Sequence, residues 1–187
     1  MHARSLLVLA ALTPALAGAQ APLKVALSGR ATTEVALSPP REAGKPAPKP
    51  FVIKIDYGQP HVRGRNVPVE LAKVDSIWRT GANASTTLTS DLDLVIGGAS
   101  VPKGAYSLYS IRTADGYALI INTATGQWGT QYDPTKDLAR VKLTPRTLGE
   151  VHESMQIALV PAGDQLPHGI MTIAWGKLEL STTWSAK

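Results

Sequence analysis

Residues 170–184 read IMTIAWGKLELSTTW, and this stretch is the strongest indication of the fold class. Apolar side chains recur at every second position on both sides of Gly176-Lys177, which is typical of strands with one buried face. A two-residue turn at Gly176-Lys177 would join the two halves into a β-hairpin. In that hairpin the facing pairs would be Trp175 with Leu178, Ile173 with Leu180, and Met171 with Thr182. We therefore predict that this face of the hairpin lies in the core.

The rest of the chain also reads as short strands separated by turns. Further strands are predicted at Ala31–Leu37, Phe51–Tyr57, Ser85–Ile96, Gly104–Arg112, Tyr117–Asn122, Leu138–Leu143 and Met155–Val160. Gly97-Gly98 is a hairpin signal, Asp115-Gly116 favours a type I′ hairpin turn, and Pro102-Lys103-Gly104 favours a type I turn. These patterns predict an all-β, single-domain antiparallel β-sandwich or jelly roll, with a closed β-barrel as the alternative.

The length of 187 residues fits one domain, and the N-terminus predicts where the protein goes. Residues 1–19 read as a secretory signal peptide, with Arg4 before an apolar run and Ala17-Gly18-Ala19 as the cleavage site. The run is shorter than the ~20 apolar residues that span a bilayer, and no later stretch reaches that length. We therefore predict a periplasmic or secreted protein with no transmembrane segment, whose single β domain covers residues 20–187.

The formal charge of +5 is concentrated near the N-terminus. The segment 39–50 reads PPREAGKPAPKP, and its prolines predict a stiff extended connector. It contains Arg41, Lys45 and Lys49, whereas Phe51–Lys187 has a formal charge of only about +1. A phosphate backbone needs several clustered cations, so we predict no nucleic-acid partner. The N-terminal charge favours loose association with an anionic cell envelope.

Several classes of chemistry are missing from the sequence. The chain has no cysteine, which excludes disulfides, thiolate metal sites, thiol nucleophiles and a lipid-modified cysteine. His61, His152 and His168 lack the spacing of metal ligands, and there is no nucleophile elbow, Walker loop or dinucleotide fingerprint. We therefore predict no metal and no cofactor. Asp91 and Asp93 alternate with leucines as on the solvent face of a strand, with a glycosidase-like carboxylate pair as the alternative.

Three segments are richer in glycine, aromatic and polar residues than plain connections require. They are residues 57–65, 78–86 and 122–133. Arginine can pair bidentately with a carboxylate, phosphate or sulfate, and tryptophan offers apolar or stacking faces. The candidate ligand-binding residues are Tyr57, Arg63, Arg65, Trp78, Arg79, Asn83, Asn122 and Trp128. In this interpretation the polar anchors are Arg65, Arg79 and Asn83, and the walls are Tyr57, Trp78 and Trp128.

Each of these residues also has a purely structural interpretation. Arg79 would then stack on an aromatic ring or bind a loop carbonyl, Asn83 would occupy a left-handed turn position, and Trp128 would cover the core. Asp137 and Arg140 are predicted to form a local ion pair with no functional role. The functional interpretation therefore depends on whether the fold brings the three segments to one end.

The order of several motifs resembles a secreted bacterial family known as domain of unknown function 2911. The most specific of them is the string Trp78-Arg79-Thr80-Gly81-Ala82-Asn83. The others, in chain order, are Tyr57-Gly58-Gln59-Pro60, Arg63-Gly64-Arg65, Pro102-x-Gly104-x-Tyr106-Ser107-Leu108, Ile121-Asn122, Gln127-Trp128-Gly129, Tyr132-Asp133, Asp137-x-x-Arg140 and Trp175-Gly176-Lys177. The resemblance implies a secreted, mostly β domain and implies no reaction.

The sequence departs from the family pattern in two places. Asn83-Ala84-Ser85-Thr86 stands where the family usually has Asn-Glu-Ala-Thr, so an acid or base role there is not carried over. The segment 66–70 replaces the Trp-Gly that usually follows the Gly-Arg of the family.

Three functions remain open at this point. The first is an exported binding module for a small polar or anionic ligand, such as a sugar or a peptide terminus. The second is an envelope structural or interaction protein without a small ligand, in which segment 39–50 is a spacer. The third is a hydrolase that uses carboxylate or histidine side chains.

Overall fold

The computed structural model describes residues 21–67, 73–164 and 166–187, and the predicted signal peptide lies outside these ranges. The described chain is almost entirely β-structure, which confirms the predicted class. Its strands are β1 (Arg30–Leu37), β2 (Phe51–Gly58), β3 (Ile77–Trp78), β4 (Thr86–Ser90), β5 (Leu94–Ile96), β6 (Ala99–Val101), β7 (Gly104–Thr113), β8 (Gly116–Asn122), β9 (Asp137–Pro161) and β10 (His168–Ala186). One short 3-10 helix, η1 (Pro134–Lys136), precedes β9. No helix in the described ranges is both long and apolar enough to cross a membrane.

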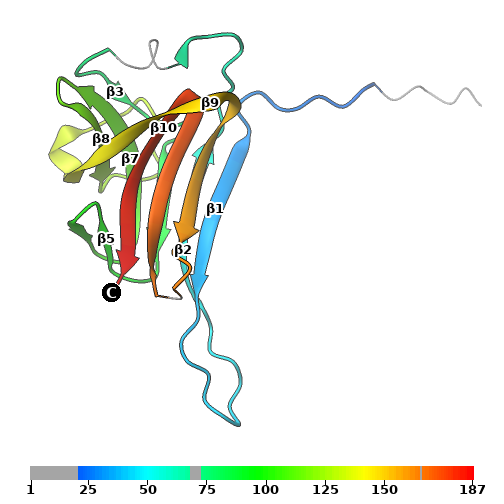
Figure 1. Cartoon of the computed structure of the whole chain (residues 1–187), viewed down its shortest axis with the longest axis vertical. Coiled ribbons are helices and arrows are strands. Elements are labelled where there is room, and N and C mark those ends of the chain that lie inside the picture. Colours follow the sequence, from blue (N-terminus) through cyan, green and yellow to red (C-terminus); the bar gives the residue numbers. More distant parts are fainter. Residues whose placement is uncertain (1–20, 68–72, 165) are drawn as a thin grey trace, which may run out of the picture.

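The strands form one antiparallel sheet that folds over on itself. Its order is β1-β2-β4-β7-β8-β9-β10-β5-β6, and β3 pairs with β7 beside this path. Strand β9 pairs with β8 through residues 137–143 and with β10 through residues 144–161, so it belongs to both layers. It curves until its far half lies beside β1, where the Leu159 N–H donates to Thr33 Oγ1 at 3.4 Å (Figure 1). This arrangement is a β-sandwich, and its sheet is open rather than closed into a barrel.

The main hydrophobic core fills the space between the layers, and a smaller cluster is formed by Tyr109, Ile111 and Ile120. Ile55, Leu88 and Leu119 come from the first group of strands and are at most 1% exposed. Ile96 and Ile173 come from strands on the β10 side and pack into the same cluster. The period-2 alternation therefore identified the buried Ile53, Ile55 and Tyr57 of β2, whereas residues 106–111 of β7 are buried without alternation.

The predicted hairpin at Gly176-Lys177 is wrong, although its buried face is right. Strand β10 runs without a turn through this point, and its partner along most of its length is β9. Trp175 and Leu180 are both buried, because a β-bulge at Gly176 shifts the buried positions from odd to even numbers. Gly176 has φ +60° and lies opposite His152, and extra residues of β9 occur on both sides of this pair, at 148–151 and at 153–155. A glycine with positive φ suits a bulge as well as a turn, so the local pattern was the same for both.

Two further turns show where local signals succeed and fail. Gly97-Gly98 forms the predicted two-residue hairpin turn, with Ile96 opposite Ala99 and both glycines at positive φ. The hairpin near Asp115 also forms, but its two turn residues are 114 and 115. Gly116 is already paired with Thr113 and has φ +128°. The predicted type I′ turn at Asp115-Gly116 is therefore one residue too late.

The predicted strand Ser85–Ile96 is broken at residues 91–93, where the chain passes from β4 to β5. Asp91 Oδ2 accepts a hydrogen bond from the Val52 N–H at 3.0 Å. Asp93 Oδ1 accepts one from the Lys103 N–H at 2.7 Å. The two carboxylates therefore satisfy backbone donors at a corner of the sandwich and do not lie on one strand face.

The Pro-rich segment 39–50 lies inside a hairpin of this domain. Strands β1 and β2 pair from Arg30 opposite Gly58 to Leu37 opposite Phe51. Segment 39–50 joins the two strands beyond the Leu37–Phe51 pair. It reverses where the Lys45 N–H donates to the Glu42 carbonyl, and it extends beyond the sheet (Figure 1). Segment 39–50 is therefore a long hairpin loop, and strand β1 belongs to the same domain as the other strands.

Candidate functional site

The three polar segments meet at the end of the sandwich where β1 begins and β2 ends. The Ala82 N–H donates to the Gly58 carbonyl at 3.1 Å, which joins the first segment to the second. The Gly129 N–H donates to the Asn83 carbonyl at 2.9 Å, which joins the second segment to the third. Ala84 and Trp128 form an isolated β-bridge beside this contact.

Glycines make these close contacts possible. A Cβ at Gly58 would overlap the Ala82 carbonyl, and a Cβ at Gly129 would lie 2.7 Å from Arg79 Cδ. Both positions therefore need a residue without a side chain. The aliphatic part of Arg79 lies directly on Gly129, so the sequence of the third segment determines where this arginine rests.

Thr80 holds the second segment in place from the inside. It is fully buried, and its Oγ1 lies 2.7 Å from Ser110 Oγ. Its carbonyl accepts a hydrogen bond from Thr86 Oγ1 at 2.8 Å. Much of the Trp-Arg-Thr-Gly-Ala-Asn string is therefore structural, and Arg79 is the member that stays partly exposed with a charge.

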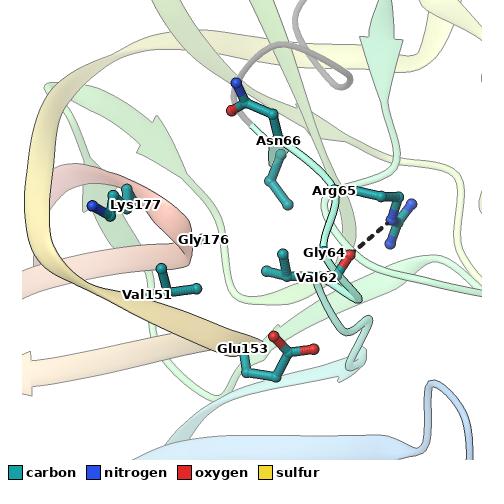
Figure 2. A pocket seen from close by; sticks show the side chains of 9 residues that line it. Val62, Gly64, Arg65, Asn66, Val151, Glu153, Gly176 and Lys177 are labelled. Atoms are coloured by element: carbon teal, nitrogen blue, oxygen red, sulfur yellow. Dashed lines mark hydrogen bonds between the residues drawn. The ribbon is translucent and has the colours of Figure 1, made fainter.

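One pocket at this end has a volume of about 400 Å³ and lies beside the bulge at Gly176. Figure 2 shows Val62 and Val151 pointing toward its centre, with Glu153 at its edge. Glu153 Oε1 accepts a hydrogen bond from the Arg63 N–H at 2.9 Å. The middle of this pocket is therefore apolar.

Arg65 lines the same pocket, but its guanidinium points away from the centre (Figure 2). Its Nε donates to the Val62 carbonyl at 3.0 Å, and one terminal nitrogen donates to the His61 carbonyl at 2.7 Å. The guanidinium carbon lies 5.4 Å from the ring centre of Trp175. Trp175 in turn stacks on Trp78, with ring centres 5.8 Å apart. Arg65 is thus committed to contacts within the protein.

A second pocket, of about 280 Å³, lies between β3 and the third segment. Its lining residues are Ile77, Trp78, Arg79, Gly129, Thr130 and Tyr132. The Arg79 side chain is partly buried here. Within the described ranges its guanidinium makes no hydrogen bond and no ion pair. This Arg79 pocket is therefore lined by aromatic residues and by a cationic side chain that has no polar partner in the described ranges.

The wall formed by Tyr132 is fixed by a polar cluster behind it. The Tyr132 hydroxyl donates to Asp137 Oδ2 at 2.6 Å, and Arg140 pairs with the same oxygen at 2.8 Å, which confirms the predicted ion pair. Burial and the hydrogen bond to Asp137 raise the pKa of Tyr132 above its usual value. The hydrogen bond to Asp137 likewise raises the pKa of Arg140. Tyr132 is therefore neutral at physiological pH, and the charges of Asp137 and Arg140 compensate each other.

Two of the predicted site residues lie inside the structure. Tyr57 is 4% exposed, and its hydroxyl accepts a hydrogen bond from the Ile157 N–H. Asn122 is fully buried and donates to the Asp133 carbonyl and to Asp137 Oδ1. Tyr57 belongs to the core, and Asn122 holds the base of the third segment.

The remaining predicted residues lie at the surface of the same end. Arg63 is exposed, with φ +51°. Asn83 has φ +62°, as its turn interpretation requires, and its amide donates to the Ser28 carbonyl. Trp128 is 51% exposed. The structure therefore brings Trp78 and Arg79 together in one pocket, and it places Arg65 in the other.

Sequence analysis missed several residues of this region. Ile77, Thr130 and Tyr132 line the Arg79 pocket, and only the aromatic Tyr132 within the third segment gave a signal for it. His61 and Ser154 face each other across an isolated bridge, with His61 Nδ1 and Ser154 Oγ 2.8 Å apart. This pair holds the first segment against β9, and their separation by 93 positions left no local pattern to detect.

The fold and the site together define a β-sandwich domain with pockets beside the glycine-rich loops at one end. The family model described as "Protein of unknown function (DUF2911)" matches residues 38–183, so this chain belongs to that family. The match confirms the resemblance seen in the motifs. No curated protein and no solved structure matches the chain significantly.

Proposed function

We propose that this protein is an exported binding module for a small anionic ligand, with the Arg79 pocket as its site. The observation that carries the proposal is the partly buried side chain of Arg79. It lies in a pocket of aromatic and apolar side chains and makes no polar contact with the described part of the chain.

A charged group that is partly removed from water is usually paired, because desolvation is costly. Arg65 meets this requirement with two carbonyls and a ring, whereas Arg79 has no polar partner within the described ranges. A carboxylate or other oxyanion would supply the missing partner through two parallel hydrogen bonds. An arginine held ready by the contact of its stem with Gly129 loses little side-chain entropy on binding.

Export is proposed on the sequence of residues 1–19 alone. Expression of the full chain in a bacterium with a periplasm should yield a mature protein that begins at Gln20. Mass spectrometry of the periplasmic fraction measures this. Recovery of the uncleaved chain in the cytoplasm would contradict the proposal.

The binding site is tested with an anion panel on the folded protein. Thermal-shift and calorimetric titrations at constant ionic strength would use phosphate, sulfate, glucuronate and phenylacetate. At least one anion should stabilise the wild-type protein, and Arg79→Met should abolish the effect while keeping the stem that packs on Gly129. Arg41→Met is the matched control, since it removes the same charge from the loop between β1 and β2. No response to any anion, or an equal loss in both variants, would overturn the proposal and favour a structural protein.

A further inference from the structure

We infer that the ligand of the Arg79 pocket is a small monocarboxylate with an apolar body. This inference rests on the proposed function and deepens it, because it names the chemical class that the site accepts. It is argued from the charge, the walls and the size of the pocket.

The charge of the pocket matches a single negative charge. Of the six residues that line it, Arg79 alone is ionised at neutral pH. Arg140 is occupied by Asp137 and adds no net positive charge behind the Tyr132 wall. A phosphate group carries close to two negative charges at neutral pH, and its binding sites typically combine several donors or cations. The planar guanidinium of Arg79 fits a carboxylate, which offers two oxygens in one plane.

The walls of the pocket are suited to an apolar body. Ile77 and Tyr132, which also pack against a small hydrophobic cluster of buried side chains, provide apolar surface, and Trp78 contributes to the lining. The Tyr132 hydroxyl is already bonded to Asp137 and Arg140, so it has little left to offer a sugar hydroxyl. The Trp78 ring is held in place by its stack on Trp175. A ligand that places a ring or a branched chain here buries apolar area without leaving polar groups unpaired.

The size of the pocket restricts the ligand to a small molecule. A volume of about 280 Å³ lies at the lower end of the range of ligand sites, roughly 300–1,000 Å³. A polysaccharide or a folded partner would have to make most of its contacts elsewhere. One ring or one short branched chain with its carboxylate is the class that the volume allows.

The test compares matched small molecules by calorimetry and by amide NMR shifts at constant ionic strength. Phenylacetate carries both features, acetate lacks the apolar body, and phenylacetamide lacks the charge. Phenylacetate should bind at least tenfold more tightly than either, with shifts at Trp78, Gly129 and Thr130. Arg79→Met should weaken phenylacetate at least tenfold and leave the affinity for phenylacetamide within twofold. Thr130→Trp, which fills the pocket from an exposed position, should abolish binding, so the test does not depend on one variant.

The outcomes separate this inference from the proposed function. Tighter Arg79-dependent binding of phosphate, sulfate or glucuronate than of phenylacetate would overturn the ligand class and leave the anion site standing. Equal affinity for acetate and phenylacetate would overturn the apolar body. Phenylacetate binding that Thr130→Trp leaves intact would place the ligand elsewhere and overturn the inference. No anion binding that depends on Arg79 would overturn both proposals.

Discussion

Arg65 and Arg79 lie in neighbouring glycine-rich regions at one end of the sandwich, and they differ in what their guanidinium groups contact. Arg65 donates to two carbonyls and lies over Trp175, so it closes the loop on which it sits. Arg79 contacts Gly129 through its stem and leaves its charge toward a pocket. An arginine beside a tryptophan is therefore a structural element at position 65 and, under the proposed function, a ligand anchor at position 79. Four predictions test this contrast.

The largest effect is expected for Trp175→Ala, which removes the ring that Arg65 covers. Trp175 is 5% exposed and packs in the main core, so its loss should lower the free energy of unfolding by about 4 kcal/mol. Urea unfolding measures this value. Trp128→Ala is the matched control, because a ring that is half exposed should cost under about 1 kcal/mol. Similar losses in both variants would contradict the placement of Trp175 in the core.

Gly58→Ala should disrupt the region of Arg79 by separating the first two segments. A methyl group there overlaps the Ala82 carbonyl, and the backbone must move, which should cost about 3 kcal/mol. Anion binding at Arg79 should weaken with it. Gly149→Ala places the same methyl group in open space and should change the free energy of unfolding by less than about 0.5 kcal/mol. An unchanged stability in Gly58→Ala would show that the segments do not cross as described.

The two arginines should separate in a direct comparison of stability. Arg65→Met loses two hydrogen bonds to carbonyls and the contact with Trp175, and it should cost about 1.5 kcal/mol. Arg79→Met loses no polar contact within the described part of the chain and should cost less than about 0.5 kcal/mol. Chemical denaturation of both variants at the same pH measures the two losses in the free energy of unfolding. A larger loss in Arg79→Met would reverse the assignment of roles.

The smallest expected effect is the dependence of stability on Tyr132 at high pH. Because the folded protein raises the pKa of this phenol, it binds the proton more tightly than the unfolded chain does. The resulting stabilisation is complete below the ordinary phenol pKa of about 10 and is lost as the pH rises through the raised value. Tyr132→Phe should therefore be less stable than wild type at pH 7, and the gap should shrink toward pH 11. Denaturation at a series of pH values measures the gap, and a constant gap would contradict the raised pKa.

Local sequence patterns predicted strands such as β2, because burial alternates with a period of two where only one face meets the core. They also predicted Gly97-Gly98, since both residues of that turn need positive φ and no distant contact is involved. They failed at Gly176, where the same glycine signal fits a turn and a bulge. There the pairing with β9, some 25 positions upstream, decides between them.

In the site, too, local patterns predict the segments but not the tertiary contacts of their side chains. Sequence alone indicated that residues 57–65, 78–86 and 122–133 were unusual, and the fold joins them. The sequence does not show that Arg65 and Arg79 have different contacts, because these depend on where the fold places Trp175 and Gly129. The sequence predicts Tyr57 and Asn122 as ligand-binding residues, because a polar group at a strand end gives the same pattern whether it faces a ligand or a buried polar group of the protein.

The position of β10 has a consequence for the order in which the molecule assembles. This strand comes last along the chain, yet it lies between β9 and β5, in the interior of the sheet. Its final residues pair with Leu94 and Val95, about ninety positions earlier. During synthesis, the β5–β6 hairpin therefore lacks its pairing with β10 until that strand has been made. Pairings of such long sequence separation fold slowly and leave strand edges open in the meantime. A protein built in this way completes the β5–β6 side of its sandwich only after β10 has been made.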